Sequence, residues 1–149
     1  LLRHHAPAVR LWLCGRPDPA NPASWTLAEI EAWTAGNPAV IYKGHCDDMK
    51  AVWAQAHAAV LPSTGGEGVP KALLEAAACG RAIVATDVPG CRDVVSEGEN
   101  GFLVPPGDAV LLAERLLLLA GDRALCRRLG AQGRALVAQE MSAAAVTAK

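Results

Sequence analysis

Long apolar runs are missing from this sequence of 149 residues. A membrane-spanning helix needs about 18 or more consecutive, mostly apolar residues. The most apolar helical pattern, AVLLAERLLLLAG, is interrupted by Glu114 and Arg115. The sequence therefore predicts no membrane-spanning helix, and no stretch has the pattern of a signal peptide.

Cysteine pairs and histidine clusters with metal-ligand spacing are missing too. The cysteines are odd in number and form no C-x-x-C pair, which argues against a disulfide framework and a structural zinc site. We interpret them as small buried hydrophobic residues in a reducing compartment, expected to be the cytoplasm. They are Cys14, Cys46, Cys79, Cys91 and Cys126. The histidines show no metal-ligand spacing either, and His57 is expected in or beside the core. We therefore expect no metal and no cofactor.

Neither sign of charge is in excess. The formal net charge of −1 gives no broad attraction to nucleic acid or to an anionic membrane. We expect no nucleic-acid partner, and any recognition of phosphate has to be local. No G-x-G-x-x-G motif precedes Asp87, so we interpret this residue as part of a turn and not as a dinucleotide ligand.

The residues that are present suit a single globular α/β domain over 1–149. Hydrophobic residues make up 52% of the chain and charged residues 19%, which allows a substantial core. Short apolar runs alternate with helical patterns, which predicts a Rossmann-like, doubly wound parallel sheet with helices on both faces. The predicted strands are 9–15, 39–44, 58–63, 82–86 and 101–105, and the predicted helices are 26–35, 49–56, 70–79, 109–120 and 122–139.

Several polar residues and glycines mark where these helices begin and end. Thr26 and Glu29 have the spacing of a capping box, and Asp108 stands where an N-cap belongs. Gly80 follows the 70–79 helix at the position of a C′ glycine. Ligands of open parallel sheets bind beyond the carboxyl ends of the strands, so the loops at those ends are the candidates for a site.

The loop PSTGGEG and the helix after it carry the strongest functional signal. Pro70 is expected in the first turn of that helix, and the amides of Lys71 and Ala72 are then free to bind an anion. Glu67 lies in the loop, whereas Glu75 lies about 7.5 Å beyond Pro70 along the helix. A nucleoside diphosphate sugar has a matching layout, with sugar hydroxyls, two phosphates and a ribose in sequence.

Simpler interpretations of both glutamates stay open on the pattern alone. Glu75 follows Lys71 by four residues, so the two could form an ordinary surface ion pair. Glu67 could be a polar loop residue. The helix KALLEAAACG is apolar on most of its surface, however, and a glutamate in a buried helix favours a functional role.

The stretch Leu61 to Asp108, LPSTGGEGVPKALLEAAACGRAIVATDVPGCRDVVSEGENGFLVPPGD, resembles the signature region of family 4 of the retaining glycosyltransferases. These enzymes have two Rossmann-like domains in the GT-B arrangement. The resemblance includes the E-x7-E pair, the LLEA segment, the PG turn and NGFLVPPGD, and it extends more weakly over nearly the whole chain. It is greatest to bacterial enzymes of capsule, lipopolysaccharide and exopolysaccharide assembly.

The resemblance implies a role for each residue of the loop and helix. It assigns Glu67 to the donor sugar near the reacting centre, Glu75 to the ribose hydroxyls, and the Lys71 and Ala72 amides to the diphosphate of a UDP- or GDP-hexose. Where many members have Gly-Phe-Gly after the first glutamate, this chain has Gly68, Val69 and Pro70, which removes one amide and an aromatic contact. The full donor-binding set that it implies is Gly66, Gly68, Val69, Pro70, Lys71, Ala72 and Glu75, with Lys43, Gly44 and His45 against the base.

The resemblance also implies that this chain is the C-terminal, donor-binding part of a longer enzyme. The acceptor-binding domain and the first strand of this domain, with its diphosphate-binding Arg and Lys, are expected outside the sequence, so that role is not given to Arg16. The partner would be a glycan or lipid-linked acceptor, and the full enzyme could associate peripherally with the inner face of the cytoplasmic membrane. A nucleotide-sugar 2-epimerase of the same architecture and a non-catalytic nucleotide-binding module are the alternatives. The isolated chain is expected to be inactive.

Overall fold

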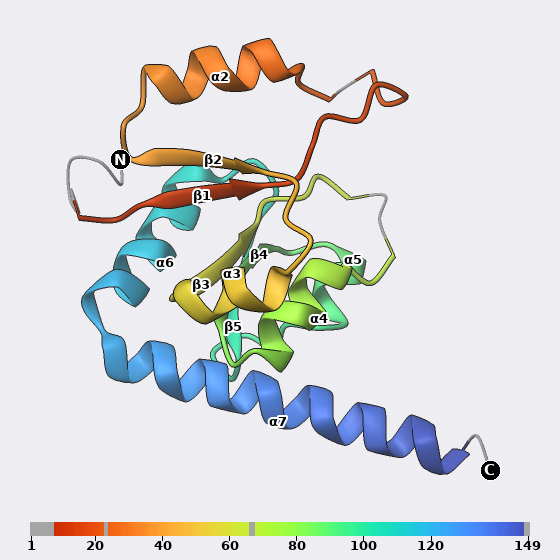
Figure 1. The fold of residues 1–149 in the computed structure, drawn as a ribbon. Coiled ribbons are helices and arrows are strands. Elements are labelled where there is room, and N and C mark those ends of the chain that lie inside the picture. The colour runs from red at the N-terminus through yellow and green to blue at the C-terminus, as the bar shows by residue number, and fades with distance from the viewer. Residues whose placement is uncertain (1–7, 23, 66–67, 148–149) are drawn as a thin grey trace. The chain divides into compact units, whose positions relative to one another are not determined.

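A computed structural model describes residues 8–22, 24–65 and 68–147, with side chains to residue 140 (Figure 1). The chain forms two compact units, one that ends at Met49 and one that begins at Lys50. Each unit has parallel strands and helices, so the predicted α/β class is confirmed. That the whole chain is one domain stays a prediction.

The first unit has two strands and one helix. Strand β1 (Leu11–Cys14) pairs in parallel with β2 (Val40–Gly44), and helix α2 (Leu27–Ala35) packs against β2 (Figure 1). The predicted capping box starts α2. The Thr26 hydroxyl accepts a bond from the Glu29 amide at 3.3 Å, and the Glu29 carboxylate accepts one from the Thr26 amide at 2.7 Å. Within 8–22 and 24–49, no residue is fully buried.

The second unit holds the core. Its elements are α3 (Met49–Gln55), β3 (Ala58–Leu61), α4 (Lys71–Ala78), β4 (Ala82–Thr86), α5 (Pro89–Arg92), β5 (Gly101–Val104), α6 (Ala109–Gly121) and α7 (Arg123–Thr147). The strands form a parallel sheet in the order β3-β4-β5. All five residues of β4 are buried, as expected for a central strand.

Helices cover both faces of this sheet. On one face, Ile83 and Ala85 pack against Leu73 and Ala76 of α4. On the other face, Val84 belongs to a cluster with residues of α6 and α7, including Leu119 and Leu129. Because successive side chains of a strand point to opposite faces, β4 contributes to both clusters. The predicted doubly wound arrangement is therefore confirmed for this unit.

The end of α4 packs tightly against α7. The amide of Gly80 donates to the Ala77 carbonyl at 2.8 Å and that of Arg81 to the Ala76 carbonyl at 2.9 Å, which is a Schellman motif. Gly80 adopts a φ of +69°, as the predicted C′ position requires. A Cβ atom on Gly130 of α7 would lie 2.0 Å from the Gly80 carbonyl oxygen. Only glycine therefore allows this contact.

Some local expectations are wrong. Pro70 is the N-cap of α4, one residue before its first turn, because its backbone is extended with a ψ of 117°. The short helix α5 forms where only a PG turn was expected, and α7 continues to Thr147. His57 is exposed, and of the five cysteines only Cys91 is buried. The core contacts that decide burial join distant segments, so local patterns do not report them.

We expect the Gly130→Ala substitution to destabilise the protein by roughly 2–3 kcal/mol, because the backbones of α4 and α7 must separate to admit the new methyl group. Gly121→Ala at the end of α6 is the matched control, since its Cβ would meet nothing within 4 Å. Urea unfolding of both variants measures the difference. Equal stabilities for the two variants would contradict this view of the junction.

Candidate functional site

A hydrogen bond attaches the described start of the loop after β3 to the core. Thr86, the last residue of β4, is only 3% exposed, and its hydroxyl donates to the Ser63 carbonyl at 2.6 Å. The Ser63 hydroxyl in turn accepts a bond from the Gly65 amide at 3.2 Å. The buried strand β4 thus fixes where the loop leaves the sheet.

The N-terminus of α4 has the form of an anion site. Pro70 is buried, and its carbonyl accepts bonds from the amides of Leu73 at 3.0 Å and Leu74 at 3.3 Å. Lys71 and Ala72 come first in the helix, so their amides have no carbonyl one turn earlier within it. Both residues are exposed. These amides and the positive end of the helix dipole can therefore bind a phosphate.

Glu75 lies on the flank of α4 and not in its buried face. The buried positions of the helix are Leu73, Ala76 and Ala77. The Glu75 carboxylate forms an ion pair with Lys71 at 3.5 Å, with 32% of the Glu75 side chain and 89% of the Lys71 side chain exposed. The simpler interpretation of Glu75 as an ion-pair partner is thus realised in the structure. Such a helical pair contributes only about 0.2–0.5 kcal/mol, so a ligand hydroxyl can compete for the carboxylate.

The rest of the predicted sugar-binding loop is described only in part. Gly66 and Glu67 lie outside the described residues, and the role of Glu67 stays a prediction. Gly68 and Val69 are exposed, and Val69 is 49% exposed although it is apolar. Val69 therefore presents an apolar side chain to solvent two residues before α4 begins at Lys71.

The predicted base-binding residues lie at the carboxyl end of β2 in the first unit. The Lys43 ammonium lies 4.2 Å from the centre of the Trp12 ring, and His45 Nε2 lies 3.2 Å from Asp47 Oδ1. Gly44 turns the chain here with a φ of +66°. Lys43 and Gly44 are the last two residues of β2, and only His45 lies in the loop after it. Their contact with a base stays a prediction.

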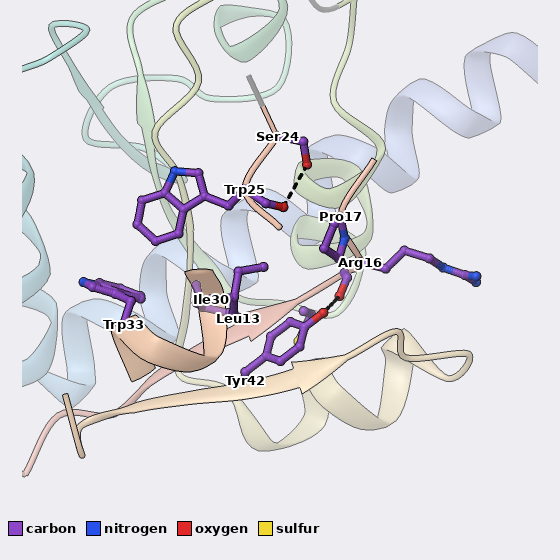
Figure 2. Close-up of a pocket in the computed structure, with 10 residues that line it drawn as sticks. Leu13, Arg16, Pro17, Ser24, Trp25, Ile30, Trp33 and Tyr42 are labelled. Atoms are coloured by element: carbon purple, nitrogen blue, oxygen red, sulfur yellow. Dashed lines mark hydrogen bonds between the residues drawn. The ribbon is translucent and has the colours of Figure 1, made fainter. Parts of the chain in front are cut away.

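A hollow that the sequence analysis did not identify lies beside this loop. It has a volume of about 380 Å³. Trp25 and Trp33 meet there edge to face at 5.7 Å, and the Tyr42 hydroxyl donates to the Gly15 carbonyl at 3.0 Å (Figure 2). The Arg16 side chain points away from the aromatic rings in Figure 2. The lining residues are Leu13, Cys14, Gly15, Arg16, Pro17, Ser24, Trp25, Ile30, Trp33 and Tyr42. The lining is mostly apolar.

The carboxyl end of β4 carries a charged pair. The Arg92 guanidinium of α5 donates a hydrogen bond to the Asp87 carboxylate, and the Asp87 amide donates to the Val104 carbonyl at 2.7 Å. The hydrogen bond from Arg92 lowers the pKa of Asp87, and the charge of Arg92 acts in the same direction. Asp87 therefore holds the turn between β4 and α5, as its interpretation as a turn residue implied.

The described part of the chain contains no group of three or more His, Cys, Asp or Glu residues that could hold a metal ion. Metal independence itself stays a prediction. Within the same residues, no helix is long and apolar enough to cross a membrane.

Comparisons with known proteins agree with this geometry. A family model described as Glycosyl transferases group 1 matches residues 1–122. EpsD of Bacillus subtilis, named as a glycosyltransferase, is 34% identical over 134 residues, which are 90% of this chain and 34% of that protein. An exopolysaccharide phosphotransferase of Streptomyces coelicolor is 46% identical over 88 residues, which are 58% of this chain and 9% of that protein. The structure of HepE from Anabaena with UDP-glucose matches with a TM-score of 0.79 at 25% identity, over 93% of this chain and 38% of that one.

The chain has parallel strands covered by helices, and the N-terminus of a helix lies at the carboxyl end of the strands. This is the arrangement of the GT-B class of glycosyltransferases, to which its structural relatives belong. The chain belongs to group 1 of the glycosyl transferases. The resemblance stated from the sequence is thereby confirmed. The chain spans about a third or less of the length of the curated relatives it matches.

We expect Asp87→Asn to lower stability at neutral pH, because the ion pair with Arg92 is lost. The pKa of Asp87 in the folded protein lies below its ordinary value of 3.8. Its contribution is therefore fully present above pH 3.8 and disappears as the pH falls through the lower, folded-state pKa. Urea midpoints from pH 7 to pH 3 measure this, with Asp93→Asn as the control. If Asp87→Asn lowers the urea midpoint by the same amount at every pH, the ion pair is not the cause of the lost stability.

Proposed function

We propose that this chain is the donor-binding part of a glycosyltransferase that transfers a hexose-type sugar from UDP or GDP with retention and without a metal. The acceptor would be a glycan or a lipid-linked glycan of bacterial polysaccharide biosynthesis. Family membership supports the transferase class. The UDP-glucose named for the HepE structure supports a nucleotide sugar as the donor.

The observation that carries this proposal is the arrangement of α4. The amides of Lys71 and Ala72 open the helix, and Glu75 lies on the same helix one turn further on. Four residues correspond to about 6 Å along a helix. With this separation, a diphosphate can bind at the helix N-terminus while the attached ribose lies beside Glu75. The Glu75 carboxylate can then accept hydrogen bonds from the ribose hydroxyls.

The N-terminus of α4 would stabilise the leaving group, which is the nucleoside diphosphate. Cleavage of the bond between the anomeric carbon and the phosphate oxygen leaves negative charge on the diphosphate. The free amides and the dipole of α4 would stabilise that charge, and this type of term is usually the largest in such sites. Glu67 would orient the sugar and stabilise its oxocarbenium-like state. We do not assign it as a nucleophile, because two-carboxylate retaining hydrolysis needs a second carboxyl about 5 Å away.

Acceptor binding would come from a further domain, since EpsD matches this chain over only 34% of its own length. We therefore propose that the chain binds UDP or GDP weakly by itself and transfers no sugar. In the cell, the full enzyme would work in the cytoplasm or at the inner face of the cytoplasmic membrane. Calorimetry that detects no binding of either nucleotide to the folded chain would overturn the donor-site proposal.

The amide of Lys71 can be tested separately from its side chain. Lys71→Pro removes the amide at the first helical position, where proline is favoured, and Pro70 already has the extended backbone that a residue before proline needs. Lys71→Ala keeps the amide and removes only the side chain. If the amide binds phosphate, UDP should bind Lys71→Pro about tenfold more weakly than Lys71→Ala, since a hydrogen bond to a charged group contributes roughly 1.5 kcal/mol or more. Equal affinities in calorimetry would exclude this amide from the site.

The two glutamates should differ in what they control. Glu75→Ala is expected to weaken UDP or GDP binding to the chain more than Glu67→Ala, because Glu75 would bind the ribose that every nucleotide carries. In the full enzyme, Glu67→Ala should lose more turnover, because Glu67 would act on the sugar. Calorimetry and the release of nucleoside diphosphate measure the two effects, with the exposed Glu99→Ala as the control. The reverse order would refute these roles.

A further inference from the structure

We propose that Cys14 and Cys46 form a thiol pair that closes to a disulfide on oxidation. The pair lies at the carboxyl ends of β1 and β2, next to Lys43 and Gly44, which end β2, and to His45, which follows them. Sequence spacing gave no indication of it, since 31 residues separate the two cysteines.

The backbone of the first unit brings the two residues together. β1 and β2 are neighbouring parallel strands, and their register places Cys14 opposite Gly44. The Gly15 amide donates to the Gly44 carbonyl at 2.8 Å, so this register is held at the strand ends. Neighbouring strands lie about 4.8 Å apart, so Cys14 lies directly beside Gly44, which Cys46 follows by two residues.

The turn at Gly44 brings Cys46 to the same place. Gly44 has a φ of +66°, and the Cys46 thiol donates to the Gly44 carbonyl oxygen at 3.7 Å. The register and this turn therefore place Cys46 beside the end of β1 that carries Cys14. Partial burial raises the pKa of Cys14, and the neighbouring Cys46 thiol raises it further. Both thiols are free.

Access distinguishes Cys14 from the other cysteines, since Cys46, Cys79 and Cys126 are half-buried and Cys91 is buried. Cys14 is exposed and Cys46 is half-buried, so a small oxidant can reach the pair from solvent. Cys91 is buried, and the Cys126 thiol donates to the Leu119 carbonyl at 3.4 Å within the other unit. Cys126 therefore provides a matched control that is partly exposed and lies outside the pair.

Hydrogen peroxide is the oxidant proposed for the formation of this disulfide. One thiolate attacks a peroxide oxygen, the O–O bond breaks, and a sulfenic acid and hydroxide form. The second thiol attacks the sulfenic sulfur, so the S–S bond forms and the oxygen leaves as water. Two thiols and one peroxide thus give one disulfide and two waters, and the two electrons lost by sulfur are taken up by the peroxide.

A disulfide would change the adjacent loop. The S–S bond of about 2.05 Å is shorter than the contact between two thiols, so closure draws Cys46 toward β1. His45 and Gly44 precede Cys46 directly and must adjust with it. This consequence rests on the proposed function: if the loop contacts the base, oxidation should weaken nucleotide binding.

Thiol counting and peptide mapping test the disulfide itself. The 149-residue chain, treated with a small excess of hydrogen peroxide, should lose two of its five thiols and give a linked Cys14–Cys46 peptide. Dithiothreitol should restore both thiols. Cys126→Ser should show the same loss of two thiols, whereas Cys14→Ser and Cys46→Ser should form no intramolecular disulfide. Five remaining thiols, or a linked peptide that joins other cysteines, would overturn the proposal.

Calorimetry with UDP tests the consequence. Affinity should fall severalfold on oxidation, return with dithiothreitol, and be insensitive to peroxide in Cys46→Ser. Equal affinity of the reduced and disulfide forms would overturn the effect on the loop. If the reduced protein binds no UDP, the proposed function fails, whereas the peptide map still decides whether the disulfide forms.

Discussion

The burial of strand β4 is the constraint on which the second unit depends. Its residues are buried on both faces by helices, and its two edges pair with β3 and β5. Thr86 ends this strand, and its hydroxyl holds the Ser63 carbonyl, so the site loop begins at a fixed point. Buried Pro70 then fixes where the loop becomes helix. The position of the candidate phosphate site is thus a consequence of core packing.

In the proposed donor site, short-range polar groups and not the overall charge would provide recognition. The net charge is −1, and the ion pairs near the strand ends are exposed and individually weak. Backbone amides at a helix N-terminus keep their direction whatever the ionic strength, because the helix holds them. The proposed donor site at the Lys71 and Ala72 amides would therefore need no basic surface.

In both units the candidate site residues lie at the carboxyl ends of the strands, and the sequence predicted the positions of these strands. The strands and most helices lie where alternating apolar runs place them, and the predicted caps at Thr26, Gly80 and Asp108 form. These features depend on residues within a few positions of one another. The order of the loop, the helix and Glu75 is likewise local, so the main elements of the candidate site could be predicted from the sequence.

The sequence by itself determined the α/β class, the family resemblance and the glycine-rich turn that leads from β3 into α4, because each rests on local spacing. Only the tertiary structure decided which cysteines are buried, that Gly130 must be glycine, that Cys14 lies opposite the end of β2, and that Trp25, Trp33 and Tyr42 surround a hollow. Each of these depends on strand register or helix packing between residues far apart in the chain. Such contacts leave no periodic pattern in a single sequence, since their distance along the chain is unrelated to their distance in space.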